Sequence, residues 1–319
     1  MSAVKKPVVC FLGPVASYTH QVHAFDTTQS GRATYGVVPF ENSTNGSVVF
    51  TLDHFADRQG LYPDLSVCAE IYLDVHHCLL GRSPPDDDDD DAGAAGPEGD
   101  PRSRPLVPLT RIERIYSHPQ AFGQCNRFLS AYLKGIETVD VSSTSRAAEL
   151  VRDDASGTSA AISSAAAARL LERDGVEVLA YNIEDREDNT TRFFVLRAGT
   201  DDSTTPGPDG DSAAKGPSSS SSPGKQTPAK TKSLLSFTVP HAAPGALADV
   251  LSCFRAAGLN LTSIASRPSL LAPFQYVFFV EFEGHRSVDP EGKVARVLEQ
   301  VGRVAESARW LGSWVNQRC

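Results

Sequence analysis

The chain has 319 residues, 40% of them hydrophobic, and this size allows two or three domains with buried cores. A net charge of -9 argues against a nucleic-acid-binding protein, and the apolar stretches are too short for a membrane span or a signal peptide. Six scattered cysteines without a Cys-x-x-Cys pair indicate a reducing compartment and no zinc site, so we expect a cytoplasmic protein without a membrane or nucleic-acid partner.

Up to about residue 198, short apolar strands alternate with helices. In chain order, strands are predicted at residues 8–12, 33–39, 67–80, 114–116, 138–141, 159–162, 176–181 and 193–196. Helices are predicted from about residue 17, over 119–133, through 147–151 and over 165–171. This alternation is typical of an α/β fold.

Two segments have too few apolar residues to offset the chain entropy lost on folding, and we predict that both are disordered. Residues 83–105 contain Pro, Gly and the aspartate run 86–91, and they are predicted to be a solvated acidic insertion. Residues 199–231 are rich in Ser, Pro, Thr and Lys, and they are predicted to be a linker between domains.

After this linker the pattern changes. Strands are predicted at residues 233–239, 259–266, 274–282 and 308–315, with helices at 244–257 and 289–305. The resulting order, βαββαβ, is that of the ferredoxin-like topology.

Hydroxyl side chains follow predicted strands at four helix starts. They are Ser17 and Thr19, then Ser117, then Ser143, Thr144 and Ser145, and finally Ser163 and Ser164. Any one of them is more simply read as an ordinary N-cap. Four helix N-termini at the carboxyl ends of strands in one domain nevertheless make a small anionic ligand plausible. A nucleotide is disfavoured, because the sequence has no Gly-x-Gly-x-x-Gly or Walker pattern.

Several short motifs, in the same order along the chain, resemble those of the prephenate dehydratases. They are Gly13-Pro14 with Ser17-Tyr18-Thr19-His20-Gln21, Val38 to Gly46 (VPFENSTNG), Ser117 to Ala121 (SHPQA), Ser143-Thr144, and Asn189-x-Thr191-Arg192-Phe193. After the linker, Pro244 to Leu247 (PGAL), Asn260-Leu261-Thr262 and Ser266-Arg267-Pro268 resemble the ACT regulatory domain that follows the catalytic part in this family.

The resemblance implies a catalytic region at residues 1–198 with the two-lobed fold of the type II periplasmic-binding proteins. Lobe 1 would hold about 1–80 and 181–198, and lobe 2 about 106–180. An ACT domain would occupy 232–319. The implied reaction is the decarboxylating dehydration of prephenate to phenylpyruvate on the route to phenylalanine. Aromatisation drives this reaction, so no cofactor and no metal are expected.

For the site, the resemblance places Thr191 beside the leaving hydroxyl, where a threonine, being a poor acid, would share a proton rather than release it. It implies that Arg192 and helix-end N–H groups hold the substrate carboxylates. The other residues implied in catalysis are Glu41, Asn42, Ser117 and Gln124. The residues implied in substrate binding are Ser17, Thr19, His118, Ser143, Thr144, Ser145, Asn189 and Phe193.

Competing interpretations remain open for several of these residues. Arg192 could equally be a structural ion-pair partner. Gln124 follows Gln120 by one turn, so both could face solvent on one helix, and Glu41 could cap its own turn. His118, next to Pro119, is more simply a turn residue than a general acid. His76 and His77 are predicted to lie in a strand and to point to opposite faces, so they make a poor metal site.

The ACT resemblance implies L-phenylalanine as an effector, bound by Gly245, Ala246, Leu247, Asn260, Leu261, Ser266 and Arg267 at a subunit interface. Ala265 stands where the family usually has glutamate, and this could weaken ligand binding. Alternatively, the domain only dimerises the enzyme. Two alternative functions are a dehydratase that acts on arogenate and a sensor protein of the same fold that catalyses no reaction. The expected assembly is a homodimer or homotetramer.

Overall fold

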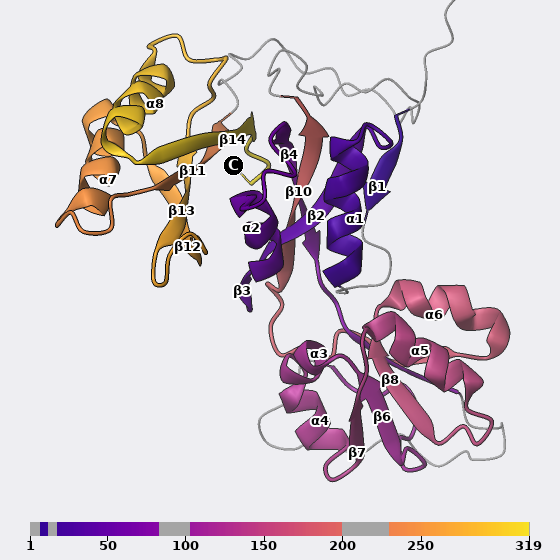
Figure 1. The fold of residues 1–319 in the computed structure, drawn as a ribbon. Coiled ribbons are helices and arrows are strands. Elements are labelled where there is room, and N and C mark those ends of the chain that lie inside the picture. Colours follow the sequence, from indigo (N-terminus) through magenta and orange to yellow (C-terminus); the bar gives the residue numbers. More distant parts are fainter. Residues whose placement is uncertain (1–6, 12–17, 83–102, 200–229, 319) are drawn as a thin grey trace, which may run out of the picture.

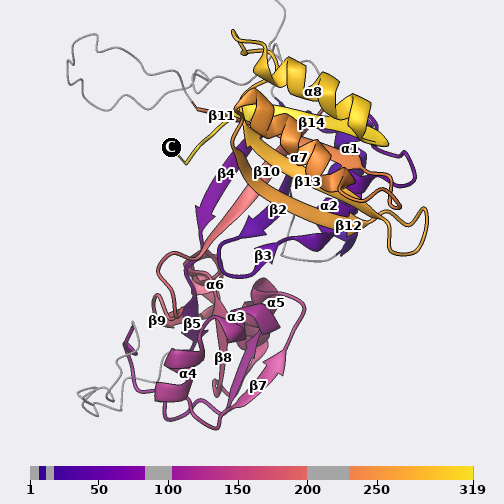
Figure 2. The ribbon, with the colours of Figure 1, turned by 90° about the vertical axis from the view of Figure 1, so that its left-hand side faces the viewer.

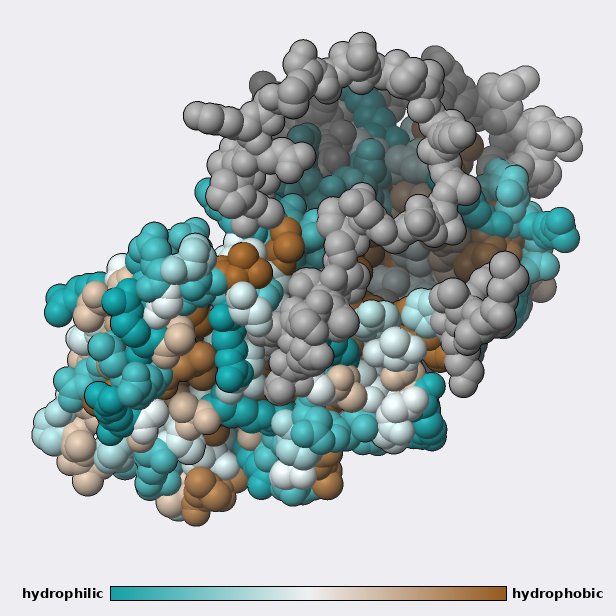
Figure 3. Space-filling view, turned by 90° about the horizontal axis from the view of Figure 1, so that it is seen from above, coloured by the Kyte–Doolittle hydropathy of each residue, from teal (hydrophilic) through white to brown (hydrophobic). Residues whose placement is uncertain are grey.

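The computed structural model describes residues 7–11, 18–82, 103–199 and 230–318 (Figure 1). The fold is α/β with two mixed sheets, as the alternating pattern predicts. Most of the predicted disordered segments, and the hydroxyl of Ser17, lie outside the described residues. Among the described residues, no helix is long and apolar enough to cross a membrane. The surface left uncovered in Figure 3 mixes polar and apolar residues without a continuous apolar band.

The first part of the larger sheet comes from two separate parts of residues 7–199. Its strands are β1 (Val9–Phe11), β2 (Tyr35–Asn42), β3 (Gly46–Ser47), β4 (Leu65–Asp74) and β10 (Thr190–Ala198). Strand β10 lies between β2 and β4 and runs antiparallel to both. Helices α1 (Tyr18–Gln29) and α2 (Val49–Ala56) pack against these strands (Figure 1).

Residues between β4 and β10 form a separate five-stranded sheet, which lies at the opposite end of the molecule from the C-terminal helices (Figure 2). Its strands, in the order β7-β6-β8-β5-β9, are β5 (Cys78–Gly81), β6 (Arg114–Ser117), β7 (Glu137–Asp140), β8 (Ser159–Ser163) and β9 (Glu177–Ala180). Its helices are α3 (Pro119–Gly123), α4 (Asn126–Tyr132), α5 (Thr144–Asp153), α6 (Ala165–Leu171) and the 3-10 helix η1 (Glu172–Asp174).

The last module has the βαββαβ order that the sequence predicts. Its elements are β11 (Thr231–Thr238), α7 (Ala246–Ala257), β12 (Leu261–Pro268), β13 (Tyr276–Glu283), α8 (Lys293–Val304) and β14 (Ser307–Val315). All four strands belong to the larger sheet, in which β14 pairs with β4 at Gly312 and Val67. Gly312 has φ +129, and a Cβ there would overlap the backbone of Val67, so the junction requires glycine.

One hydrophobic core crosses this junction. Phe194 of β10 contacts the Trp314 ring of β14, with ring centroids 5.0 Å apart, and both side chains are fully buried. Leu234 and Phe279 of the last module belong to the same cluster. The last module is therefore packed against the strands that lead to the site described below.

The structure corrects two of the predicted elements. The single strand predicted at 67–80 is two strands in different sheets, β4 and β5, so His76 and His77 lie in the link between them and not in a strand. The helix predicted over 119–133 is broken into α3 and α4 around Gln124 and Cys125. Helix α2 was not predicted, although Leu52 and Phe55 on its buried face have helical spacing.

Candidate active site

Two chain segments join the two sheets, and they pair with each other. Residues 75–77 lead from β4 to β5, and residues 181–189 lead from β9 back to β10. The Val75 N–H donates to the Asn189 carbonyl over 2.7 Å, and the Ile183 N–H donates to the His77 carbonyl over 2.9 Å. Through these backbone hydrogen bonds the two connecting segments run side by side across the junction.

Several strands end in hydroxyl or amide residues, and these ends meet at the junction. Strands β6, β7 and β8 are parallel, so their carboxyl ends lie at one edge of the smaller sheet. Strand β5 starts at that edge, with Cys78 opposite Ser163. In the larger sheet, Thr191 at the start of β10 lies opposite Asn42 at the end of β2. Both sheets therefore present polar strand ends toward the segments that join them.

Thr191 lies half-buried beside Asn42 in a defined hydrogen-bond geometry. The Oδ1 atom of Asn42 accepts from the backbone N–H groups of Thr44 and Asn45, both at 3.0 Å, which fixes its amide orientation. Its Nδ2 atom then points at Asn189 Oδ1 over 2.9 Å and at Thr191 Oγ1 over 3.1 Å. Thr191 Oγ1 is thus an acceptor in this contact, and among the described residues its own proton has no acceptor.

Gln124 extends the network to the smaller sheet. Its Oε1 atom lies 3.1 Å from Asn189 Nδ2 and 2.7 Å from His77 Nε2. The break between α3 and α4 turns Gln124 inward, while Gln120 is exposed. The Glu184 carboxylate, which is buried, accepts from the His77 N–H at 2.8 Å and contacts His76 Nδ1 at 2.9 Å. The sequence pattern placed both histidines inside a strand and so gave His77 no role beside Thr191, and it did not single out Glu184.

The helix-start hydroxyls act mainly as caps. Ser143 Oγ accepts from the Arg146 N–H at 3.0 Å and Ser164 Oγ from the Ala167 N–H at 3.2 Å. His118 caps α3 through Nδ1, which accepts from the Gln120 N–H at 3.2 Å. Ser117 is buried and donates to the Ile162 carbonyl at 2.9 Å. These contacts agree with the N-cap and turn interpretations, and they also place the four side chains at the edge that faces the junction.

The structure gives fewer contacts for the other residues that we expect to bind substrate. Thr144 and Ser145 form the first turn of α5 behind the Ser143 cap and are half-buried. Thr19 lies in α1, but its side chain, like all of Ser17, is outside the described part of the structure. Phe193 is half-buried in β10, next to Arg192.

Arg192 points away from Thr191, because neighbouring residues of a strand face opposite sides. It is 5% exposed, and its Nη2 atom lies 2.6 Å from both the Glu70 and the Glu281 carboxylates. Burial opposes the charge, but Glu281 and Glu70 outweigh this and raise the pKa of the Arg192 guanidinium. Of the two interpretations of Arg192, the structure shows the ion pair. Glu41, half-exposed, is 3.7 Å from Arg192 Nη1 and belongs to the rim of the same cluster.

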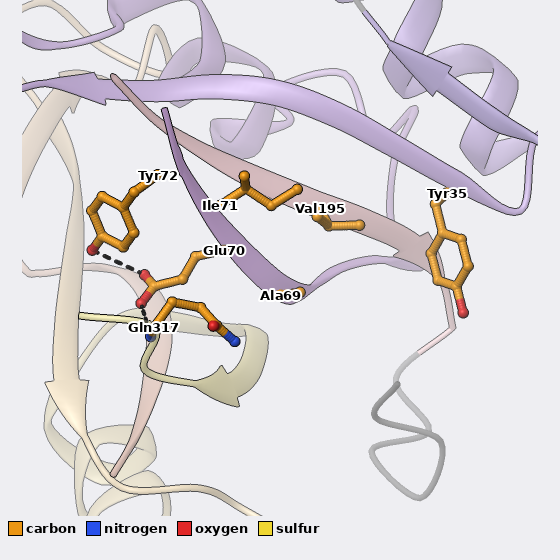
Figure 4. A pocket seen from close by; sticks show the side chains of 7 residues that line it. All are labelled: Tyr35, Ala69, Glu70, Ile71, Tyr72, Val195 and Gln317. Atoms are coloured by element: carbon orange, nitrogen blue, oxygen red, sulfur yellow. Dashed lines mark hydrogen bonds between the residues drawn. The ribbon is translucent and has the colours of Figure 1, made fainter. Parts of the chain in front are cut away.

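Glu70 also borders a cavity of about 550 Å³, which Tyr35 of β2 and Val195 of β10 line as well (Figure 4). Figure 4 shows its carboxylate between the Tyr72 hydroxyl, 3.4 Å away, and the backbone N–H of Gln317, 3.0 Å away. Burial raises the pKa of the Tyr72 phenol, so it stays protonated at neutral pH. The buried carboxylate therefore has partners on both sides.

The residues expected to bind an effector separate into two groups. Gly245, Ala246 and Leu247 line a cavity of about 440 Å³ together with Tyr276 and Phe278. Ser266 lies on β12 opposite Phe278. Asn260 is exposed and Leu261 packs into the core of the last module, so neither lines this cavity.

Arg267 forms a bidentate pair with Asp53 of α2, at 2.8 and 2.9 Å. Ala265, in the same strand, packs against the core that β10 and β14 share. Arg267 therefore contacts α2, Ala265 packs against the shared core, and neither lines the cavity at Gly245.

The cysteines and acidic groups form no metal centre in the described residues. No group of three or more His, Cys, Asp or Glu side chains there could hold a metal ion. Cys68, Cys78 and Cys125 are buried free thiols, and Cys10 and Cys253 are half-buried.

Comparison with known proteins identifies what this arrangement resembles. The family model for prephenate dehydratase matches residues 15–201. A bifunctional chorismate mutase/prephenate dehydratase from Stutzerimonas stutzeri is 32% identical over 331 positions, which cover 98% of this chain and 74% of the relative. A crystal structure of prephenate dehydratase with L-Phe from Arthrobacter aurescens has a TM-score of 0.70 at 26% identity, covering 97% of this chain and 90% of that one. A structure described as a quorum-quenching acylase has a TM-score of 0.66 at 25% identity, covering 97% and 98%.

Proposed function

The chain belongs to the prephenate dehydratase family, and on this premise we infer that it converts prephenate to phenylpyruvate in the biosynthesis of phenylalanine. The ring C–O bond breaks and the hydroxyl leaves as water, while the bond to the ring carboxylate breaks and its electrons complete the aromatic ring. One proton is consumed, and carbon dioxide and the phenylpyruvate anion are the other products. The observation that supports this most is the Thr191 hydroxyl at the junction of the two sheets, whose proton has no acceptor in the described part of the chain.

The reaction needs a donor for the departing hydroxyl oxygen. Because Asn42 Nδ2 donates to Thr191 Oγ1, the threonine proton is directed away from Asn42. We propose that it is donated to the substrate hydroxyl and that the Asn42 contact makes it a better donor through hydrogen-bond cooperativity. Thr191 shares this proton without releasing it, since its own pKa lies far above neutrality.

The substrate has two carboxylates, which need positive potential. We propose that the first turn of α5 supplies part of it, since Ser143 caps one N–H there and leaves those of Thr144 and Ser145 for a ligand. The hydroxyls of Ser117 and Ser163 lie at the same edge. Arg192 is not assigned to the substrate, because its guanidinium is held by Glu70 and Glu281.

We also propose the finer domain arrangement that the resemblance implies. The catalytic region, 1–198, has two lobes of the type II periplasmic-binding kind, with lobe 1 at about 1–80 and 181–198 and lobe 2 at about 106–180. The substrate binds where residues 75–77 and 181–189 join the lobes. Residues 232–319 are an ACT domain, which the βαββαβ order of its elements supports.

L-Phenylalanine is the proposed effector. The relative from Arthrobacter aurescens was crystallised with this ligand. Here the apolar cavity of about 440 Å³ at Gly245, Ala246 and Leu247 has a volume suited to a small ligand with an aromatic side chain. A homodimer or homotetramer is the proposed assembly, and light scattering of the purified protein tests it.

Incubation of the purified chain with prephenate, followed by detection of phenylpyruvate, tests the function directly. Arogenate in a parallel reaction tests whether the aminated analogue is preferred, and an acylated quorum-sensing compound tests the acylase activity described for a protein of similar fold. We expect turnover of prephenate. Hydrolysis of the acyl compound without any phenylpyruvate formation would refute the proposed function.

A further inference from the structure

The amide orientations around Thr191 are determined by backbone groups, and they can be followed through the whole network. A backbone N–H can only donate, so the Asn42 atom that Thr44 and Asn45 contact is its oxygen. The other end of Asn42 is therefore the NH₂ group, which must donate to Asn189.

The same reasoning extends to the smaller sheet. Since Asn189 Oδ1 accepts from Asn42, its Nδ2 atom faces Gln124 and donates to the Gln124 oxygen. That oxygen also contacts His77 Nε2 at 2.7 Å, and an amide oxygen has no proton to give. His77 must therefore carry its proton on Nε2.

We propose that His77 is a positioning residue for Thr191, acting through Gln124, Asn189 and Asn42, an inference that rests on the proposed function. His77 itself is 7% exposed and touches Gln124, not Thr191. Its Nε2 proton pairs with the Gln124 oxygen that also accepts from Asn189, so the histidine, together with the backbone contacts of Asn42, supports the Asn42 NH₂ group on Thr191 Oγ1. The histidine thereby helps to hold Thr191 with its proton facing the substrate.

The network also links the two sheets. His77 lies in the segment leading out of the larger sheet, Gln124 lies between α3 and α4, and Thr191 is the second residue of β10. Asn189 is almost fully buried, so an unpaired amide there would lose a hydrogen bond without gaining water. The hydrogen bonds from His77 to Thr191 can all form only when the two sheets keep their present relative position. The orientation of Thr191 therefore depends on that position.

Two substitutions separate positioning from bulk stability. His77→Leu removes the donor at similar size, whereas His77→Gln offers an amide NH₂ group near the place of Nε2. We expect His77→Leu to lower kcat on the order of 10- to 100-fold with KM changed less than about threefold, as for a misplaced catalytic group. His77→Gln should recover most of that loss. His285→Leu, which removes a buried histidine of the last module, is the matched control and should leave kcat unchanged.

A double substitution tests the route of the effect. If His77 acts through Thr191, His77→Leu added to Thr191→Ala should lower the residual rate little further. Equal kcat for His77→Leu and the wild type, or fully multiplicative losses in the double variant, would overturn the proposal. If His77→Leu fails to fold, His77→Asn replaces it, because its shorter side chain cannot reach Gln124.

The tautomer of His77 is a readout independent of turnover. Long-range ¹⁵N–¹H NMR spectra of the wild type should show the proton of His77 on Nε2. A proton found on Nδ1 alone would refute the positioning role whatever the activity. Absence of prephenate turnover together with an Nε2 proton would refute the proposed function and the catalytic consequence, but not the orientation of the network.

Discussion

Arg192 and Glu281 form a buried ion pair with Nη2 and Oε2 2.6 Å apart, across 89 positions of sequence. Arg192 follows Thr191 directly in β10, and Glu281 lies in β13 of the last module. The strand that presents Thr191 on one face is thus held from its other face by a carboxylate of the neighbouring module. Lys232, 3.2 Å from Glu281, completes the charge balance of the cluster.

Removal of the Arg192 charge should destabilise the protein strongly. Arg192→Met leaves the Glu70 and Glu281 carboxylates buried with only Lys232 nearby, and breaking such a pair typically costs about 3–5 kcal/mol. Chemical denaturation followed by tryptophan fluorescence measures this, since Trp314 lies in the adjoining core. The matched control is Arg114→Met, whose pair with Glu137 is exposed to solvent and should therefore contribute little to stability. Equal denaturation midpoints for the two variants would contradict the role assigned to the cluster.

The contact between α2 and β12 should weaken in acid. Burial opposes the charge on Asp53, but its hydrogen bonds to Arg267 and Arg58 outweigh this and lower the pKa of the carboxyl. A lowered folded-state pKa stabilises the fold above the unfolded value of about 3.9, and this contribution is lost as pH falls through the folded-state pKa.

Asp53→Asn should therefore lower the denaturation midpoint at pH 7 and have a smaller effect near pH 3. Urea titrations at several pH values measure the denaturation midpoints of the wild type and the variant at pH 7 and near pH 3. Asp140→Asn, for which no ion pair is described, serves as the control for adding an amide. A loss from Asp53→Asn that stays the same from pH 7 to pH 3 would show that the ion pair does not stabilise the fold.

Phenylalanine should bind the cavity at the start of α7. Leu247→Ala removes apolar surface from its lining, and we expect about tenfold weaker inhibition by L-phenylalanine, corresponding to roughly 1.4 kcal/mol. Initial rates against phenylalanine concentration provide the measurement, and Leu298→Ala, on α8 and outside the lining, is the control. Inhibition that is unchanged in Leu247→Ala would place the effector elsewhere, and a flat response of the wild type would mean that no such regulation exists.

Local patterns predicted most of the strands and helices, because apolar periodicity reports burial directly. They could not separate β4 from β5, since residues 67–80 contain no glycine, proline or asparagine to mark a break and the chain changes sheet within that run. That change of sheet placed His77 in a link and not on a strand face. The break at Gln124 was equally hidden, because Phe122, Cys125 and Phe128 keep helical spacing across it.

The partner of Arg192 could not be predicted from the motif around it. Whether a guanidinium meets a substrate or a protein carboxylate depends on which residues the fold brings near, and Glu281 comes from beyond the linker. The hydroxyls at helix starts were easier to interpret, because a cap is a local contact, and Ser143 and Ser164 make the expected bonds. Their role toward a substrate stays a prediction.

The central claim is that Thr191 donates its proton to the departing hydroxyl of prephenate. Steady-state kinetics of Thr191→Ala and Thr191→Ser, with circular dichroism to verify folding, test it most directly. We expect Thr191→Ala to lose about 2.7–4 kcal/mol of transition-state stabilisation, on the order of 10²- to 10³-fold in kcat, as for other key donors, and Thr191→Ser to retain most of the activity. A folded Thr191→Ala protein that forms phenylpyruvate at the wild-type rate would contradict the mechanism.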